Sequence, residues 1–140
     1  MLRTMPEFHF ANDVTVRFAE TDAQGVAHHA SYIVWFEVTR IEYLRRFRGG
    51  YSGLRQEGVD ALTLEVYAKY VDAARFDDRL TIRARCSDVR GARFRFDYLV
   101  ERDGERVAEG WTTHACVTVD EHRPTRIPGW LAEAITEAES

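Results

Sequence analysis

The chain has 140 residues, a length typical of one domain, and its 45% hydrophobic and 30% charged composition excludes an intrinsically disordered protein. It has 19 basic and 23 acidic residues, a net charge of −4 and a pI near 5.7. This charge argues against sequence-independent electrostatic binding of DNA or RNA. We therefore expect a single globular domain over residues 1–140, with no nucleic-acid partner.

Cysteine spacing and hydropathy bear on the compartment. Cys86 and Cys116 form no C-x-x-C motif, so they predict neither a zinc site nor a disulfide framework. The longest apolar run, residues 32–36, is too short to span a membrane, and the N-terminus lacks the pattern of a signal peptide. We expect a cytoplasmic protein without a membrane span.

The first half of the chain predicts a strand, a loop and one long helix. Residues 8–18 contain a β-branched run and read as a strand, and the polar residues 20–25 that follow are typical of a loop. Residues 30–47 contain neither proline nor glycine, and Gly49 and Gly50 then provide a stop. The pattern predicts a helix over 30–47.

Apolar residues lie on two sides of this helix. One side, predicted to face the core, carries Tyr32, Phe36, Tyr43 and Phe47, widened by Ile33 and Leu44. The other side carries Val34, Val38 and Ile41, which suggests that more than one surface covers the helix. Glu37 and Arg40 are expected to form an ion pair within the helix or at an interface.

After Gly58 the alternation of apolar and polar residues predicts strands. Period-two segments cover 62–70, 80–86 and 93–98, and a long strand covers 107–119. Residues 88–91 are expected to form a hairpin turn, as are 103–104, and residues 130–138 a short terminal helix. The fold class predicted is α+β, with a five-stranded antiparallel sheet and one long helix packed on it.

Most motifs that would imply a cofactor or a metal are absent. No G-x-G-x-x-G or G-x-x-x-x-G-K-[ST] is present, and residues 50–53 miss the spacing of a serine nucleophile elbow. His28 and His29 are adjacent, a spacing that does not easily chelate one ion. We therefore expect neither a cofactor nor a metal.

The segment 21–32 is a candidate catalytic site, because it joins an acidic loop to the start of the long helix. N–H groups in the first turn of a helix lack partners within the helix, so one of them can hold a developing oxyanion. A carboxylate a few residues upstream, Asp22, can act on the same carbonyl carbon as nucleophile or general base. The alternative is that Asp22 only caps the loop and His29 only starts the helix.

The motif T-D-A-Q-G-V-x-x-H-A-S-Y, then W-F-E-x-x-R-x-E, residues 74–78 and residues 113–117, resembles the hotdog-fold acyl-CoA thioesterases of the 4-hydroxybenzoyl-CoA thioesterase type. The similarity covers residues 14–128 and is closer to the branch associated in bacteria with the Tol-Pal system. It implies a sheet wrapped around the long helix. It also implies homodimers or homotetramers with active sites at the subunit interface.

The resemblance assigns roles residue by residue. Asp22 corresponds to the catalytic carboxylate, and His29 supplies the backbone N–H that polarises the thioester carbonyl. Gly25 and Tyr32 fall in the substrate-binding segment. Arg90 and Arg93 flank a hairpin expected near the nucleotide end of coenzyme A, where they pair with phosphates or, alternatively, only solvate a turn. The chain departs from the usual family pattern at three places: His28, Ser31 and residues 73–75.

Other polar residues in the strands have structural readings. Glu65 is either a second carboxylate of the site or an outward strand residue. His114 and Cys116 share one strand face and are expected to pack in the core, and Asp77 and Asp78 to form a turn.

By this resemblance, the expected function is hydrolysis of an acyl-CoA thioester to a carboxylic acid and free coenzyme A. Two alternatives stay open. One is a hotdog hydratase or dehydratase acting on enoyl or 3-hydroxyacyl thioesters, which places acid and base at Cα and Cβ. The other is a non-catalytic acyl-CoA binding or scaffold protein.

Overall fold

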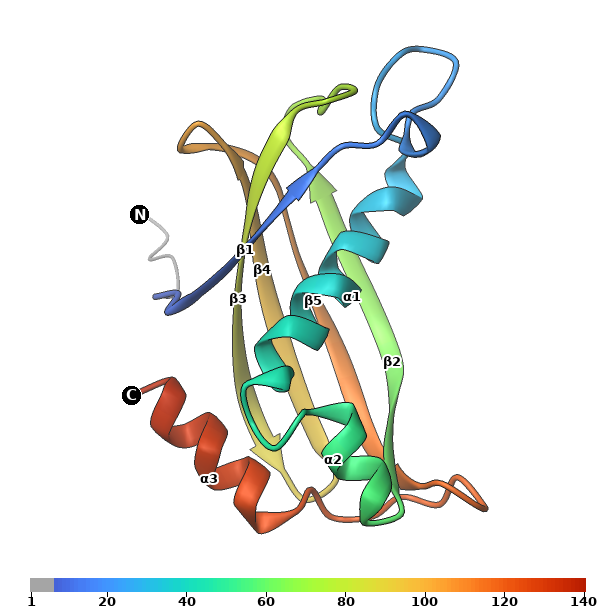
Figure 1. Cartoon of the computed structure of the whole chain (residues 1–140), viewed down its shortest axis with the longest axis vertical. Coiled ribbons are helices and arrows are strands. Elements are labelled where there is room, and N and C mark those ends of the chain that lie inside the picture. Colours follow the sequence, from blue (N-terminus) through green and yellow to red (C-terminus); the bar gives the residue numbers. More distant parts are fainter. Residues whose placement is uncertain (1–6) are drawn as a thin grey trace.

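The structure, a computed structural model, describes residues 7–140 and is built on one five-stranded sheet. The strand order is β1-β3-β4-β5-β2, and every neighbouring pair is antiparallel. The 17-residue helix α1 (His29–Arg45) runs along one face of the sheet (Figure 1). The strands are β1 (Phe10–Thr15), β2 (Val59–Tyr70), β3 (Arg79–Arg90), β4 (Arg93–Arg102) and β5 (Glu105–Thr118). The predicted α+β class and sheet are confirmed.

The core lies between α1 and the sheet, where aromatic rings from both meet. Phe36 stacks on Tyr98 of β4 with ring centroids 4.3 Å apart, and Tyr43 meets Phe96 edge to face at 5.0 Å. Gly110 on β5 permits this approach, because a Cβ there would lie 2.8 Å from the Phe36 ring. The glycine therefore sets how closely the helix packs.

Shorter helices complete the fold. A 3₁₀ turn, η1 (Phe18–Glu20), follows β1, α2 (Tyr51–Gln56) follows α1, and α3 (Gly129–Ala138) ends the chain. The sequence did not predict α2, because six residues between glycines show no helical period. In the described part of the chain, every helix is too short or too polar to cross a membrane.

Several predicted boundaries were wrong: the long helix ends at Arg45 instead of 47, β2 begins at Val59 instead of 62, and β4 ends at Arg102 instead of 98. The first strand ends at Thr15 instead of 18, because the chain turns into η1. Residues 88–90 of the turn predicted at 88–91 instead belong to β3, which continues to Arg90 through a bulge where Asp88 has a φ of 51°. The actual turn is at Gly91 and Ala92.

The helix faces also differ from prediction in two respects. Ile33 is 40% exposed, so it does not belong to the core face, whereas Tyr32, Phe36, Tyr43 and Leu44 are buried as predicted. Arg40 does not pair with Glu37. It is buried, and donates to the hydroxyls of Tyr51 and Tyr98 at 3.0 and 3.1 Å. Two tyrosine hydroxyls therefore accept the hydrogen bonds of the Arg40 guanidinium, whereas spacing along the helix had indicated Glu37 as its partner.

Candidate active site

Asp22 lies in a tight turn between η1 and α1. Its Oδ1 accepts the Gln24 N–H at 2.8 Å, and its main-chain carbonyl accepts the Gly25 N–H at 3.0 Å. Gly25 has a φ of +80°, a backbone conformation that favours glycine, so the turn itself requires a glycine at this position. Among residues 7–140, no hydrogen-bond donor reaches Asp22 Oδ2. One carboxylate oxygen is therefore fixed and the other is free to act.

Backbone pairing holds the loop in place. Thr21 forms an antiparallel bridge to Ala27, and Val26 forms another to Arg75. The Ala27 N–H donates to the Ala74 carbonyl at 2.7 Å. The Asp22 turn is thus attached to the segment between β2 and β3, immediately before α1 begins.

The start of α1 leaves one N–H without a partner. The Ala30 N–H donates to Nδ1 of His28 at 3.1 Å, and the Ser31 N–H donates to the His28 carbonyl at 2.9 Å. Within residues 7–140 the His29 N–H has no acceptor. Of these three donors, it is therefore the one that remains available to a ligand. It lies at the N-terminal end of the helix, which carries a partial positive charge.

A cleft of about 420 Å³ opens beside this helix end, lined by Val26, Ala27, His29, Tyr32, Tyr70, Val71, Asp72 and Ala73. The rings of Tyr32 and Tyr70 meet at 4.9 Å, and the Tyr70 hydroxyl donates to the His29 carbonyl at 3.0 Å. Burial raises the pKa of the Tyr32 hydroxyl, which therefore stays neutral. His29 and Tyr32, both predicted, line this cleft. Asp22 and Gly25 lie in the loop that reaches its wall at Val26.

The family is decided by comparison with known proteins. Residues 16–135 match the thioesterase-like superfamily. The chain belongs to this superfamily. It is 32% identical over 120 residues to the acyl-CoA thioesterase YbgC of Haemophilus influenzae, covering 85% of this chain and 88% of that protein. It is 30% identical over 116 residues to the acyl-CoA thioester hydrolase YbgC of Escherichia coli O157:H7, covering 82% and 87%.

Solved structures agree with the hotdog fold expected for this superfamily. The hypothetical protein TT1821 from Thermus thermophilus superposes with a TM-score of 0.85 at 33% identity, covering 91% of this chain and 98% of that one. The 1,4-dihydroxy-2-naphthoyl-CoA thioesterase Slr0204 from Synechocystis also gives 0.85 at 19% identity, covering 94% and 98%. The second likeness concerns the fold alone.

The structure of this thioesterase-like protein places Arg90 and Arg93 far from Asp22. Arg93 of β4 and Leu62 of β2 both pair with Ala115 of β5, so they lie at the same height in the sheet. Tyr70, which contacts His29, lies eight residues further along β2. At a rise of ~3.3 Å per residue, the strand position beside Arg93 and the strand position beside His29 are roughly 25 Å apart. The turn between β3 and β4 and the loop before α1 indeed lie at opposite ends of the sheet (Figure 1). One chain does not bring these predicted residues together.

Arg90 and Arg93 line a second cleft, of about 260 Å³, with Glu65, Asp88, Phe94, Arg95, Thr113 and His114. Arg95 was not singled out from the sequence. It donates to Asp97 at 3.0 Å and stacks over the Trp111 ring at 4.8 Å, so its guanidinium is held in position. Glu65 accepts a hydrogen bond from Thr113 at 2.9 Å on this side, which makes it an outward strand residue remote from Asp22.

His114 is buried, as predicted, but within a polar network. Its Nε2 lies 2.7 Å from Thr112 Oγ1, which in turn lies 2.7 Å from the Tyr98 hydroxyl, and Arg40 donates to that hydroxyl. Burial, and then the charge of Arg40, lower the pKa of His114 to about 3. The imidazole is therefore neutral at ordinary pH. Cys116 is also buried, as predicted.

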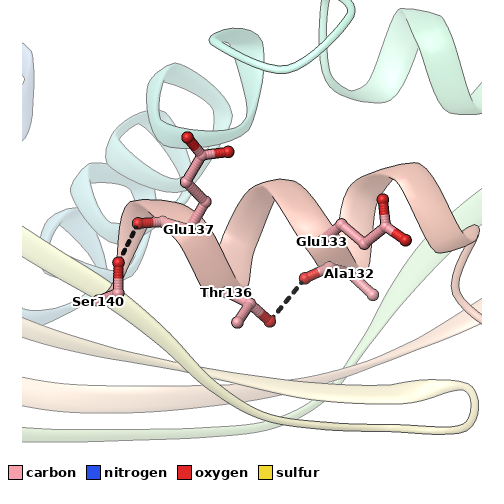
Figure 2. A pocket seen from close by; sticks show the side chains of 5 residues that line it. All are labelled: Ala132, Glu133, Thr136, Glu137 and Ser140. Atoms are coloured by element: carbon pink, nitrogen blue, oxygen red, sulfur yellow. Dashed lines mark hydrogen bonds between the residues drawn. The ribbon is translucent and has the colours of Figure 1, made fainter.

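A third hollow runs along α3 and has a different character. Figure 2 shows the side chains that line it, four from α3 and one from the last residue of the chain, beyond the helix: Ala132, Glu133, Thr136, Glu137 and Ser140. The hydroxyls of Thr136 and Ser140 donate to main-chain carbonyls of the same helix at 2.9 and 2.7 Å. These groups are satisfied locally, and none belongs to the site around Asp22. Over residues 7–140, no three His, Cys, Asp or Glu side chains gather as a metal site would require.

Proposed function

We propose that this protein hydrolyses acyl-CoA thioesters, with Asp22 and the His29 N–H as its catalytic groups. The observation that carries the proposal is that one backbone-paired segment holds a carboxylate with a free oxygen, Asp22, and an unpartnered N–H at the start of a helix, His29, which lines a cleft with Tyr32 and Tyr70. The YbgC relatives, named for acyl-CoA thioester hydrolysis, support the substrate class. CoA is the leaving group in this assignment.

The chemistry follows from these two groups. Asp22 takes a proton from water, or attacks the carbonyl carbon directly, and the carbonyl oxygen becomes negative. The His29 N–H, backed by the positive end of α1, stabilises this oxyanion. The tetrahedral species then collapses and the C–S bond breaks. Where water attacked, Asp22 passes the proton it took to the CoA thiolate, and the carboxylic acid is released. Where Asp22 attacked, an acyl anhydride forms on Asp22, and a water molecule hydrolyses it, which releases the acid, regenerates the carboxylate and supplies the proton for the thiolate. Tyr32 and Tyr70 form the wall against which the acyl group lies.

The working species we propose is a homodimer or homotetramer whose sites lie between subunits. The strand β2 is an edge of the sheet, and Leu62, Leu64, Val66 and Tyr67 on it are each between 38% and 44% exposed. Val34 and Val38 extend the exposed apolar surface onto α1. An unpaired apolar edge of this length is a surface that another strand can cover.

Antiparallel pairing of two β2 strands would resolve the separation of Arg90 and Arg93 from Asp22. Such pairing reverses the partner, so the partner's β3–β4 end lies near this chain's β2 C-terminus, where His29 and Tyr70 meet. Arg90, Arg93 and Arg95 of one subunit would then bind CoA phosphates while the other subunit performs the chemistry.

Release of free thiol from a panel of acyl-CoA substrates tests the proposal. Asp22→Asn keeps the side-chain shape and removes the carboxylate, and its kcat should fall by roughly 10²–10⁴. A wild-type protein that binds acyl-CoA without releasing thiol would instead support a binding or scaffold role. Hydration of enoyl-CoA without thiol release would support a hydratase. An Asp22→Asn variant with more than about a third of wild-type kcat would exclude this residue as the catalytic carboxylate.

A further inference from the structure

Glu20, two residues before Asp22, is a buried carboxylate outside the catalytic pair. It is 8% exposed, and both of its oxygens are hydrogen-bonded. Oε1 accepts the Arg17 N–H at 2.8 Å, and Oε2 accepts the indole N–H of Trp35 at 2.9 Å. The Arg17 guanidinium adds a longer contact at 3.3 Å. Because Trp35 lies in the second turn of α1, this side chain connects the 3₁₀ turn to the helix.

The main chain of Glu20 holds the same helix at its start. Its carbonyl accepts the His28 N–H at 2.7 Å and the Ser31 hydroxyl at 3.1 Å. His28 precedes His29, the residue whose N–H is unpartnered, and Ser31 lies two residues after it. Glu20 therefore holds the backbone just before the oxyanion donor and a side chain in the same helical turn, and Asp22 follows two residues later along the chain.

We propose that Glu20 is a positioning residue, whose bond to Trp35 holds the Asp22 loop in register with the His29 N–H. The proposal rests on the proposed function, since register between these two groups matters only if both act on one carbonyl. A displacement of about 1 Å in such an arrangement costs up to ~10²-fold in rate. We name this set, Glu20 with Arg17 and Trp35, the loop clamp.

The charge state of Glu20 suits this role. Burial alone would raise its pKa, but the hydrogen bonds from the Arg17 N–H, the Trp35 indole and the Arg17 guanidinium outweigh burial, so the pKa lies below its usual range. The side chain is thus a pure acceptor at neutral pH, facing two N–H donors. A glutamine would turn its NH₂ group toward one of these donors, which breaks a bond without changing side-chain size.

The test compares Glu20→Gln and Trp35→Phe with Glu133→Gln, a matched change at an exposed position on α3. We expect Glu20→Gln to lower kcat by about 10- to 100-fold with little change in KM, because the clamp acts on the reacting geometry. Trp35→Phe removes the same bond from its other side, so the double variant should be no slower than the worse single one. Circular dichroism and sizing establish that each variant is folded.

Amide hydrogen exchange supplies a readout that does not depend on turnover. In Glu20→Gln, the His28 amide should exchange faster than in wild type while amides of the central strand β4 do not change. Unchanged His28 exchange overturns the loop clamp whatever the activity. Folded variants with kcat within about threefold of wild type also overturn it. A wild-type protein that releases no thiol refutes the proposed function, and with it the positioning role.

Discussion

The Tyr43 hydroxyl of α1 donates a hydrogen bond of 2.5 Å to the carboxylate of Glu139, beside the end of α3. The same oxygen, Oε2, accepts the Cys86 N–H of β3 at 3.0 Å. Pairing of β1 with β3 extends only as far as Phe10 and Ala84, so Cys86 lies just beyond it. A side chain from the C-terminus thus completes the hydrogen bonding of β3 where its neighbour strand ends.

Glu139→Ala should therefore destabilise the fold. It removes the shared acceptor of two part-buried donors, and we expect a loss of about 1–3 kcal/mol in the free energy of unfolding. Glu139→Gln keeps an oxygen in that place and should lose less. Urea unfolding measures both, with Glu137→Ala, an exposed change on the same helix, as control. Equal stability of all three variants would contradict the role given to Glu139.

Much of the fold could be predicted because its signals are local. The alternation on β3 and β4 and the uninterrupted helix before Gly49 follow from residue periods alone. The bulge at Asp88 and the helix α2 depend on tertiary packing and were missed. The partners of Arg40 come from distant segments, so spacing along the chain suggested Glu37 instead of Tyr51 and Tyr98.

The candidate site was predictable in part for a similar reason. Asp22 and His29 lie seven residues apart, so one local motif indicates both. Tyr70 and Glu20 gave no distinct signal: the first was an ordinary strand position and the second an ordinary loop acid. Their roles depend on hydrogen bonds across 41 and 15 residues of sequence. The relation proposed for Arg90 and the site involves a second subunit, which no pattern within one chain describes.

Arg90 and Arg93 are predicted to bind phosphate groups of the substrate. Changing both to alanine should raise KM with little change in kcat, because the contact is the same in the ground and transition states. The effect should weaken as salt is added, since exposed charges are screened. Steady-state kinetics at two ionic strengths measure this. Unchanged KM at both would mean that the pair only solvates the turn.

The edge strand β2 is predicted to be a subunit interface. Val66→Lys places a charge on this edge and should shift the protein toward monomer, because a lysine on an edge strand opposes strand pairing. Light scattering after size exclusion measures the mass, with Thr136→Lys on exposed α3 as control. If the active site needs both subunits, kcat/KM should fall with the dimer fraction. A monomeric wild-type protein with full activity would contradict this prediction.

His114 should make stability depend on pH below neutrality. Its pKa is 6.5 in the unfolded chain and about 3 in the fold, so between these values the unfolded state binds the extra proton. Stability should then fall as pH decreases below 6.5, by up to about 1.4 kcal/mol per pH unit. His114→Gln removes this titration while keeping polar atoms near Thr112. Urea unfolding between pH 4 and 7 should give a flatter dependence for the variant, and parallel curves would contradict the assignment.

The backbone and the side chain of His29 can be separated by two substitutions. His29→Ala keeps the N–H and should leave substantial activity, whereas His29→Pro removes it. Proline is tolerated at the first residue of a helix, and His28 before it has a φ of −62° and a ψ of 140°, the extended conformation that a residue before proline requires.

We therefore expect the His29→Pro variant to fold but to lose most of its catalytic activity. Loss of one oxyanion donor should lower kcat by roughly 10²–10³, equivalent to about 2.7–4 kcal/mol. Circular dichroism and sizing first establish that it is folded and has the same mass as wild type. Equal activity of the two variants would then exclude the backbone N–H, because only one of them retains it. An alanine variant as inactive as the proline variant would assign the role to the imidazole, whose ring stacks on His28 at 4.1 Å.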